Sequence, residues 1–370
     1  MGKLEEAIFE INKKFKDTIV KQGVERDVRE KIPFSSPRLN YMVYGGLPLG
    51  IAVEFFGPEN GGKTTTALDV VKNAQIYSVK EYNRKLEELE TQIEKTGKDK
   101  KLKELQLSLS ELVENGPRKV LYIDAENTLS EEWARTNGVD IDNLILARPL
   151  HQTAEQVLQI ILDMIDTGQI ILVVLDSIPM LVSQQLYEED MSKKAYAGVS
   201  APLSMFAARV APKLNEQQTL LIMINQVREN INNPYATDST PGGRAVKHLY
   251  AVRLMFRRGS FIDDKGEELN QKAENPAGNL VNVLVHKTKV FRPDRRQGFY
   301  TLNYTTGIDK VADLVDLAIK EGVIDRAGAW FSVENDNGEE VKFQGKLKLI
   351  EYLRDNVYLA DKIEDKLSGL

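Results

Sequence analysis

The chain has 370 residues, a net charge of −6 and no cysteine. This length accommodates one large domain with small additions, or two to three domains. The lack of cysteine excludes disulfides, thiolate zinc sites and cysteine nucleophiles, and the three scattered histidines form no metal-ligand motif. Net acidity argues against a protein coated in positive charge, although local basic loops remain compatible with nucleic-acid binding.

The N-terminal segment predicts an amphipathic helix. Leu4, Ile8, Ile11, Phe15 and Ile19 recur at steps of three or four residues and form a narrow apolar stripe. Such a helix either folds back on its own domain or docks on a neighbouring subunit, and composition does not choose between the two. The segment is charged throughout and has no apolar run of signal or membrane length, so we expect a cytoplasmic protein that does not enter a membrane.

An alternation of strands and helices follows. Near-continuous apolar strands are predicted in IAVEFF, KVLYIDAE, LILARP, QIILVVLDS and LNEQQTLLIMINQ. Apolar strands separated by helices are typical of a parallel sheet covered on both faces. After about residue 250 the strands follow one another without helices, which predicts an antiparallel extension. We therefore expect an N-terminal helix and linker over 1–32, an α/β core over 33–308 and a small α+β lobe over 309–370.

One segment, at about residues 80–115, interrupts this alternation. It contains two apolar stripes separated by the polar turn KTGKDK. The simplest interpretation is an inserted antiparallel helical hairpin with a short coiled-coil seam, and the alternative is one long solvated helix. The sequence assigns no function to this insertion. The stripe residues are Tyr82, Leu86, Leu89 and Ile93, then Leu102, Leu105, Leu109 and Leu112.

The stretch FFGPENGGKTTTALDVV contains a phosphate-binding loop between a predicted strand and a predicted helix. Its glycines allow backbone N–H groups to converge on phosphates at the positive end of the helix. We expect Lys63 to reach the β- and γ-phosphates of a nucleotide and the Thr64 hydroxyl to ligate Mg²⁺. The candidate nucleotide-binding residues are Gly57, Pro58, Glu59, Asn60, Gly61, Gly62, Lys63, Thr64 and Thr65.

Carboxylates end two of the predicted strands. Asp176 closes the apolar strand IILVVLDS, where it suits a Mg²⁺ contact in a phosphoryl-transfer site; the alternative is a helix cap by Asp176 or Ser177. Asp124 and Glu126 follow another strand, in YIDAEN. Glu126 is placed to polarise the water that attacks a γ-phosphate, or merely to cap a helix.

Amides and glycines flank a long polar loop. Asn225 and Gln226 end a predicted strand, where amides can sense a γ-phosphate. The loop that follows carries Arg228 and Arg244 outward as candidate DNA contacts, and an ordinary surface loop is the alternative. The adjacent glycines Gly242–Gly243 indicate close backbone approach to another backbone or to a phosphate.

A basic run, VHKTKVFRPDRRQ, follows in the antiparallel region. Charge runs are usually solvated surfaces. Lys287 and Lys289, however, are two positions apart on a predicted strand and therefore point to the same side. Such a pair of cations is suited to meet the phosphates of a nucleotide bound by another subunit.

Taken together, these segments resemble the bacterial RecA-type recombinases, including the phage-encoded members. The resemblance is carried by GGLPLGIAVEFFGPENGGKTTTAL, YIDAENTLSEEWARTNGVDIDNLILARP, VVLDS, LLIMINQVRENI, TPGGRAVKHLYAVRL and GIDKVADLVDLAIKEGVIDRAGAWFSV. It spans roughly residues 33 to 360 apart from the helical insertion. It implies a RecA-like P-loop ATPase core, with an N-terminal oligomerisation helix that docks on the next subunit and a small C-terminal α+β lobe.

For ATP, the resemblance implies roles for five residues. Glu126 matches the family's catalytic glutamate, and Trp133 falls where the family stacks an aromatic ring on the adenine. Gln226 matches the amide that couples the γ-phosphate to the second DNA-binding loop. Lys287 and Lys289 match a lysine pair that reaches across the protomer interface to the neighbour's ATP.

For DNA, the resemblance implies two binding loops, at about 183–198 and 227–243. The residues implied to contact the single strand are Arg209, Arg228, Gly242 and Gly243, with Ile231 wedged between bases. Some positions depart from the family pattern. Pro202 stands where the family often has a DNA-contacting arginine, and Ser130 replaces an acid near the adenine amine. The chain also lacks the family's long acidic C-terminal tail.

The resulting functional hypothesis is an ATP- and Mg²⁺-dependent recombinase that forms helical filaments on single-stranded DNA and pairs it with homologous double-stranded DNA. Its expected partners are both forms of DNA and further copies of the chain, with loading or mediator proteins as additional candidates. The alternatives are a hexameric helicase or translocase built on the same core, and an ATP-gated scaffold that coats DNA without exchanging strands.

Overall fold

A computed structural model describes residues 3–15, 29–96, 99–188, 198–227, 240–335 and 338–369. The chain divides into two compact units, residues 1–30 and 31–370. The first unit contains helix α1 (Lys3–Phe15), on which Leu4, Ile11 and Phe15 of the expected apolar stripe are exposed. Ile19, the last residue of that stripe, lies outside the described residues. Docking of α1 on a neighbouring subunit stays a prediction.

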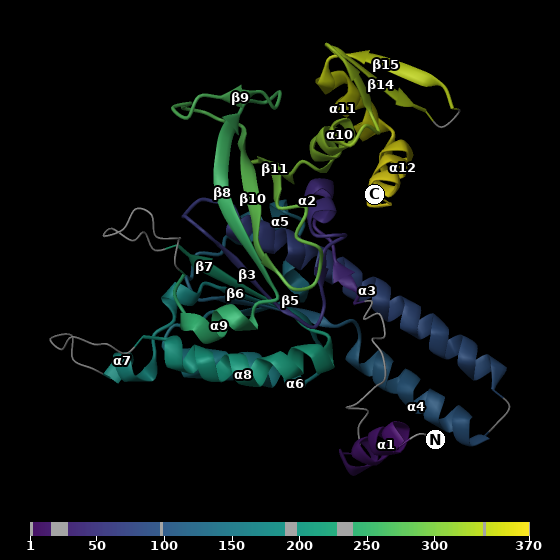
Figure 1. Ribbon diagram of the computed structural model, residues 1–370, viewed down its shortest axis with the longest axis vertical. Helices are drawn as coiled ribbons and strands as arrows, with labels where there is room; N and C mark the ends of the chain where they lie inside the picture. Colours follow the sequence, from purple (N-terminus) through teal and green to yellow (C-terminus); the bar gives the residue numbers. More distant parts are fainter. Residues whose placement is uncertain are drawn as a thin grey trace. The chain divides into compact units, whose positions relative to one another are not determined.

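The second unit is built on a mostly parallel central sheet (Figure 1). Its spatial order is β12-β11-β10-β8-β3-β7-β6-β4-β5. The parallel part comprises β3 (Ala52–Gly57), β4 (Lys119–Asp124), β5 (Leu144–Ala147), β6 (Ile170–Asp176) and β7 (Leu220–Gln226). β8 (Val252–Ile262) runs parallel to β3 and begins the extension, which continues antiparallel through β10 (Gly278–Thr288), β11 (Gln297–Asn303) and β12 (Gly307–Ile308). The parallel sheet with an antiparallel extension is thus confirmed.

Helices cover both faces of this sheet because its central strands are apolar on both sides. In β3, Val53 and Phe55 join one core cluster, whereas Ala52 joins the other. The first cluster packs under the start of α3 (Lys63–Lys95), and the second under α6 (Ala154–Asp166) and α8 (Ser200–Gln217), which Figure 1 shows on the same side as α9 (Gly243–Leu249). The candidate site therefore lies at the ends of strands that are covered by helices on both faces of the sheet.

The insertion is a pair of helices rather than one. Its first arm is the continuation of α3, which starts at the phosphate loop and has no fully buried residue after Ser78. The second arm, α4 (Asp99–Asn115), packs against α3 and returns alongside it (Figure 1). The eight apolar residues of the expected seam are all partly buried. The sequence did not indicate that the first arm is continuous with the nucleotide-site helix.

The C-terminal region has its own core. α10 (Lys310–Lys320), α11 (Lys346–Asp355) and α12 (Val357–Ser368) pack with a small antiparallel sheet of β13 (Asp325–Ala327), β14 (Trp330–Glu334) and β15 (Glu340–Gln344). The remaining elements are β1 (Lys31–Ile32), α2 (Pro37–Met42), β2 (Leu47–Pro48), α5 (Glu131–Thr136), α7 (Gln184–Glu188) and β9 (Glu268–Leu269), with short 3₁₀ turns at Ile141–Asn143 and Ile178–Met180. Within the part of the chain that the structure describes, no helix is long and apolar enough to span a membrane.

A buried carboxylate joins α10 to α2. Asp313 accepts hydrogen bonds from the Ser36 hydroxyl and, at 3.1 Å, from the backbone N–H of Arg38. The Arg38 Nε lies 3.3 Å from the other carboxylate oxygen. Burial is nevertheless the dominant influence and raises the pKa of Asp313 to about 6, against an ordinary value of 3.8. The ionised carboxylate is therefore held in an environment that favours its protonated form.

This shift predicts a pH-dependent stability. The folded protein retains the Asp313 proton up to about pH 6, whereas the unfolded chain releases it near pH 3.8. Ionisation across this window therefore lowers the free energy of unfolding, by on the order of 3 kcal/mol at neutral pH. Asp313→Asn removes this titration. The unfolding free energy of the variant minus that of wild type should therefore increase by about 3 kcal/mol between about pH 4 and pH 7.

Urea unfolding across this pH range measures the difference. Asp361→Asn, on the exposed part of α12, is the matched control for loss of a carboxylate. The raised pKa of Asp313 would be contradicted if the difference in unfolding free energy between the two proteins did not change with pH, or if it changed in favour of the wild type.

Candidate nucleotide-binding site

The phosphate loop is held by close contact with the neighbouring strand β8. A Cβ atom at Gly57 would lie 2.1 Å from the backbone carbonyl oxygen of Phe256, and one at Gly61 would lie 3.0 Å from it. Gly62, which precedes α3, has a φ of 91° in the left-handed region. Glycine is therefore required at these positions by backbone approach and conformation. The unpaired N–H groups of the first turn of α3 open onto the loop and form an anion site.

Lys63 is folded over the loop that precedes it. Its Nζ donates to the carbonyl oxygens of Gly57 at 3.1 Å and Pro58 at 2.6 Å. Burial lowers the pKa of Lys63, and the nearby carboxylates Asp176 and Glu126 oppose this effect. The ammonium group is thus already positioned at the loop, where an incoming phosphate can replace the carbonyl acceptors.

Thr64 and Asp176 meet at the base of the site. The Thr64 hydroxyl donates to Asp176 Oδ2 at 2.9 Å, and the Tyr122 hydroxyl donates to the same oxygen at 2.8 Å. Burial raises the pKa of Asp176 to about 6, partly offset by these two hydrogen bonds. The group is therefore largely ionised at neutral pH. A hydroxyl and a carboxylate side by side provide the oxygen ligands that Mg²⁺ prefers.

The two acids after β4 have different surroundings. Asp124 accepts hydrogen bonds from the backbone N–H groups of Thr128 and Leu129, at 3.2 and 3.1 Å. It therefore fixes the turn that follows the strand. Glu126 instead accepts a hydrogen bond from the Ser177 hydroxyl at 2.5 Å and lines the hollow above the loop. The helix cap that the sequence left open as the alternative for Glu126 is supplied by Ser130, whose side chain accepts a hydrogen bond from the backbone N–H of Trp133.

A hollow of about 700 Å³ brings most of the candidate residues together. Trp133 lines it from α5, and its indole Nε1 lies 3.4 Å from the Thr65 hydroxyl. Its lining residues from the sequence prediction are Glu59, Asn60, Gly61, Gly62, Lys63, Thr64, Thr65, Glu126, Trp133, Asp176 and Gln226. The antiparallel region adds residues that the sequence did not indicate, namely Arg258, Asn279, Leu302 and Tyr304.

Lys287 and Lys289 do not line this hollow. Lys287 Nζ donates to the carbonyl oxygen of Lys247 at 2.6 Å, and Lys289 Nζ donates to that of His248 at 2.9 Å. Both acceptors belong to the last turn of α9. Burial, followed by the charges of Lys289 and Arg253, lowers the pKa of Lys287. The two ammonium groups lie on one side, at consecutive carbonyls and away from their own protomer's phosphate loop.

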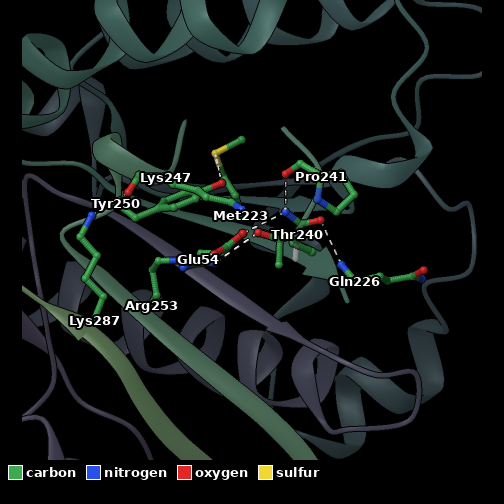
Figure 2. A network of polar contacts seen from close by, with 10 residues as sticks. Glu54, Met223, Gln226, Thr240, Pro241, Lys247, Tyr250, Arg253 and Lys287 are labelled. Atoms are coloured by element: carbon green, nitrogen blue, oxygen red, sulfur yellow. Dashed lines mark hydrogen bonds and ion pairs between the residues drawn. The ribbon is translucent and has the colours of Figure 1, made fainter. Parts of the chain in front are cut away.

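A buried polar network joins β3, β7 and β8 (Figure 2). Arg253 Nε donates to Glu54 Oε2 at 2.5 Å, with both side chains almost fully buried. Asn225 Nδ2 donates to Glu54 Oε1 at 2.9 Å and to the Pro241 carbonyl oxygen at 3.0 Å. Arg253 also donates to the Thr240 hydroxyl at 3.2 Å. The network thus ties the strand before the phosphate loop to the segment that precedes α9.

The candidate DNA-binding residues are only partly described. Arg228 and Ile231, with most of the two expected loops, lie outside the described residues. Gly242 and Gly243 have φ values of 109° and 78° at the start of α9 and closely approach the beginning of α8. Arg209 Nη1 donates to the side-chain oxygen of Gln159 on α6 at 3.2 Å. Arg244 lies in the first turn of α9.

The fold and this geometry define the chain as a phosphate-loop nucleotide-binding protein. Comparison with known proteins gives the family. The model of the RecA N-terminal domain matches residues 2–81 and 93–309, and that of the RecA C-terminal domain matches residues 312–369. The chain belongs to the RecA family. The gap in the first match falls within the extended arm of α3.

Individual relatives match along almost the whole chain. Protein RecA of Streptomyces ambofaciens is 32% identical over 98% of this chain and 84% of its own length. Protein RecA of Paracoccus denitrificans is 31% identical over 98% of this chain and 88% of its own length. The crystal structure of the RadB recombinase is similar over 73% of this chain and 95% of its own, with 18% identity and a TM-score of 0.46.

The buried network predicts a large effect from removal of one charge. Arg253→Met leaves Glu54 buried without its cationic partner, which should lower the free energy of unfolding by about 3–5 kcal/mol. The double variant Glu54→Gln/Arg253→Met should recover much of this loss, because no uncompensated charge is left. Urea unfolding of the single and double variants measures both effects.

Arg135→Met is the matched control. Arg135 pairs with Asp142 at 3.2 Å in a solvent-exposed ion pair, so its loss should change stability by less than about 1 kcal/mol. Equal effects of Arg253→Met and Arg135→Met would show that the buried pair is not a structural anchor.

Proposed function

We propose that this RecA-family protein is an ATP-dependent DNA recombinase, which forms helical filaments on single-stranded DNA and exchanges strands with a homologous duplex. The observation that carries the proposal is a divided ATP site. One half is the hollow that contains the phosphate loop and Glu126. The other half is the lysine pair at the end of β10, Lys287 and Lys289, which lies elsewhere in the same protomer. Stacking of protomers would bring the two halves together and make the ATP site part of the filament interface.

In this proposal the residues of the hollow hold ATP by its phosphates. The N–H groups of the loop and the Lys63 ammonium bind the phosphate oxygens. The Thr64 hydroxyl and the Asp176 carboxylate would hold Mg²⁺, which bridges phosphates and neutralises developing charge. Trp133, at the edge of the hollow, offers its indole face to the adenine.

Glu126 is the proposed general base for ATP hydrolysis. Its carboxylate faces the hollow and is oriented by the Ser177 hydroxyl at 2.5 Å. In that position it can accept a hydrogen bond from the water that attacks the γ-phosphate, and take its proton. Lys287 and Lys289 of the adjacent protomer would meet the negative charge that develops on the γ-phosphate oxygens.

The DNA would be held by the segments between β6 and α8 and between β7 and α9. Gln226 would join the two sites, because it lines the hollow and is the last residue of β7, directly before the second of these segments. The single strand is gripped through its phosphates and by side chains between its bases, whereas base pairing with the incoming duplex decides homology. Recombination on a bacterial or phage chromosome takes place in the cytoplasm, which we propose as the protein's location.

The proposed division of the ATP site predicts complementation between two inactive variants. Glu126→Gln should bind ATP and DNA but lower DNA-stimulated hydrolysis at least about 100-fold. The double variant Lys287→Ala/Lys289→Ala should be similarly inactive. In an equimolar mixed filament, about a quarter of the interfaces combine an intact Glu126 with an intact lysine pair, so hydrolysis should return to about that fraction of wild type.

The control mixture combines Glu126→Gln with the triple variant Glu126→Gln/Lys287→Ala/Lys289→Ala. It contains no intact Glu126 and should recover no hydrolysis. If the first mixture is as inactive as its components while all variants still bind DNA, the lysines do not act across the interface.

Strand exchange tests the proposed function directly. With ATP and Mg²⁺, the protein should transfer a labelled strand from a homologous duplex to its single-stranded complement, and it should leave a heterologous duplex intact. Electron microscopy of the same sample should show open helical filaments. Filaments without exchanged product would identify an ATP-gated scaffold instead, and closed rings that unwind heterologous duplexes would identify a helicase.

A further inference from the structure

Tyr122 is a buried tyrosine of β4 to which the proposed chemistry assigns no role. Its side chain is fully buried and belongs to the core cluster that packs under α3. In the sheet, β4 lies between β5 and β6, with Tyr122 opposite Val174 and Asp124 opposite Asp176. Tyr122 does not line the ATP hollow. Any effect of this residue on the site therefore acts through a neighbouring side chain.

That neighbour is Asp176. The Tyr122 hydroxyl donates to Asp176 Oδ2 at 2.8 Å, and the Thr64 hydroxyl donates to the same oxygen at 2.9 Å. The two donors come from different elements, since Tyr122 belongs to β4 and Thr64 to the first turn of α3. Hydrogen bonds to a carboxylate are short and directional. Two of them on one oxygen restrain the rotation of the Asp176 carboxylate from two sides.

The two donors differ in what else they do. Thr64 lies at the phosphate loop, lines the hollow and is itself a proposed ligand of Mg²⁺. Tyr122 belongs to a strand inside the sheet, where close packing of its ring leaves the hydroxyl little freedom to move. The fixed reference for the orientation of Asp176 is therefore the tyrosine.

Filling the core does not by itself require this hydroxyl. A phenylalanine has nearly the same shape and needs no acceptor, whereas a buried phenol must find one. Asp176, only 6% exposed at the end of an apolar strand, is in turn a buried carboxylate that needs donors. Tyr250 provides the contrast, because it is equally buried but its hydroxyl meets the Met223 sulfur at 3.7 Å and no carboxylate.

We propose that Tyr122 is a positioning residue of the nucleotide site, whose hydroxyl holds the Asp176 carboxylate in the orientation in which it receives Mg²⁺. The inference rests on the proposed function of the hollow, because it takes Asp176 as a ligand of the ion. Side chains that hydrogen-bond a metal-binding carboxylate commonly contribute about 10- to 100-fold to metal affinity.

The test measures nucleotide binding by the full-length protein, without DNA and without hydrolysis. The probe is a fluorescent, non-hydrolysable ATP analogue, and its dissociation constant is measured in excess Mg²⁺ and in EDTA. The ratio of the EDTA value to the Mg²⁺ value is the Mg²⁺ effect. Tyr122→Phe should lower the Mg²⁺ effect at least about tenfold, because the carboxylate is no longer held in place. The dissociation constant in EDTA should change by less than about twofold, because the phosphate loop is intact.

Two further variants separate positioning from a general loss of structure. Tyr250→Phe removes an equally buried hydroxyl away from Asp176 and should leave the Mg²⁺ effect unchanged within about twofold. Asp176→Asn should lower the Mg²⁺ effect by itself. Addition of Tyr122→Phe to Asp176→Asn should then change it by less than about twofold, because the carboxylate on which the tyrosine acts is absent.

Three results would overturn the inference. The first is an equal Mg²⁺ effect in wild type and Tyr122→Phe, and the second is equal weakening by Tyr122→Phe with Asp176 present or replaced. The third is a wild type that binds the analogue equally in Mg²⁺ and in EDTA, which would refute the proposed metal site as well. Strand exchange is measured separately, so its failure would contradict the proposed recombinase function and leave the role of Tyr122 standing.

Discussion

Glu54 and Arg253 form an ion pair at the centre of the sheet, and the candidate site depends on it. Both charges are removed from water, and Asn225 and Thr240 supply the remaining hydrogen bonds. Apolar side chains of similar volume would hold the strands together equally well, so stability alone does not explain such a pair. Unlike an apolar contact, the ion pair with its hydrogen bonds forms in only one relative orientation of the strands. It fixes the relative positions of β3, β7 and β8. β3 leads to the phosphate loop, β7 ends at Gln226, and Arg253 of β8 pairs with Lys287 of β10.

A second constraint aligns the same strands at the level of the phosphate loop. The Phe256 carbonyl oxygen lies so close to Gly57 and Gly61 that no side chain fits between them. The loop is therefore seated against β8, and β8 is paired with β10, which carries Lys287. Consequently the antiparallel extension supports the loop and presents the lysine pair from one continuous piece of sheet. A nucleotide that shifts the loop must work against both the backbone contact and the buried ion pair.

The sequence predicted the parts of the site that follow from strand ends and loop spacing. Carboxyl ends of parallel strands meet at one edge, so Asp176 and Glu126 were expected near the phosphate loop, and both line its hollow. The distinction between Asp124 and Glu126 required hydrogen bonds that only the folded turn defines. Asn279 and Arg258 were missed because they reach the hollow through antiparallel pairing that contains an irregular register near Asn279. The partnership of Glu54 with Arg253, which lie 199 positions apart, has no local signal at all.

Helix α9 is the element through which DNA and ATP would influence each other under the proposed function. It has only seven residues, begins at the glycines that close the second expected DNA segment, and ends at the carbonyls that hold Lys287 and Lys289. A cation at a helix C-terminus stabilises the helix through the dipole and through charge-assisted hydrogen bonds. The lysines therefore cannot reach a neighbour's phosphates without giving up contacts that stabilise α9. DNA would order the N-terminal end of α9, and the lysines would be released from its C-terminal end. Both events act on the same short helix, so α9 would couple DNA binding directly to the ATP site.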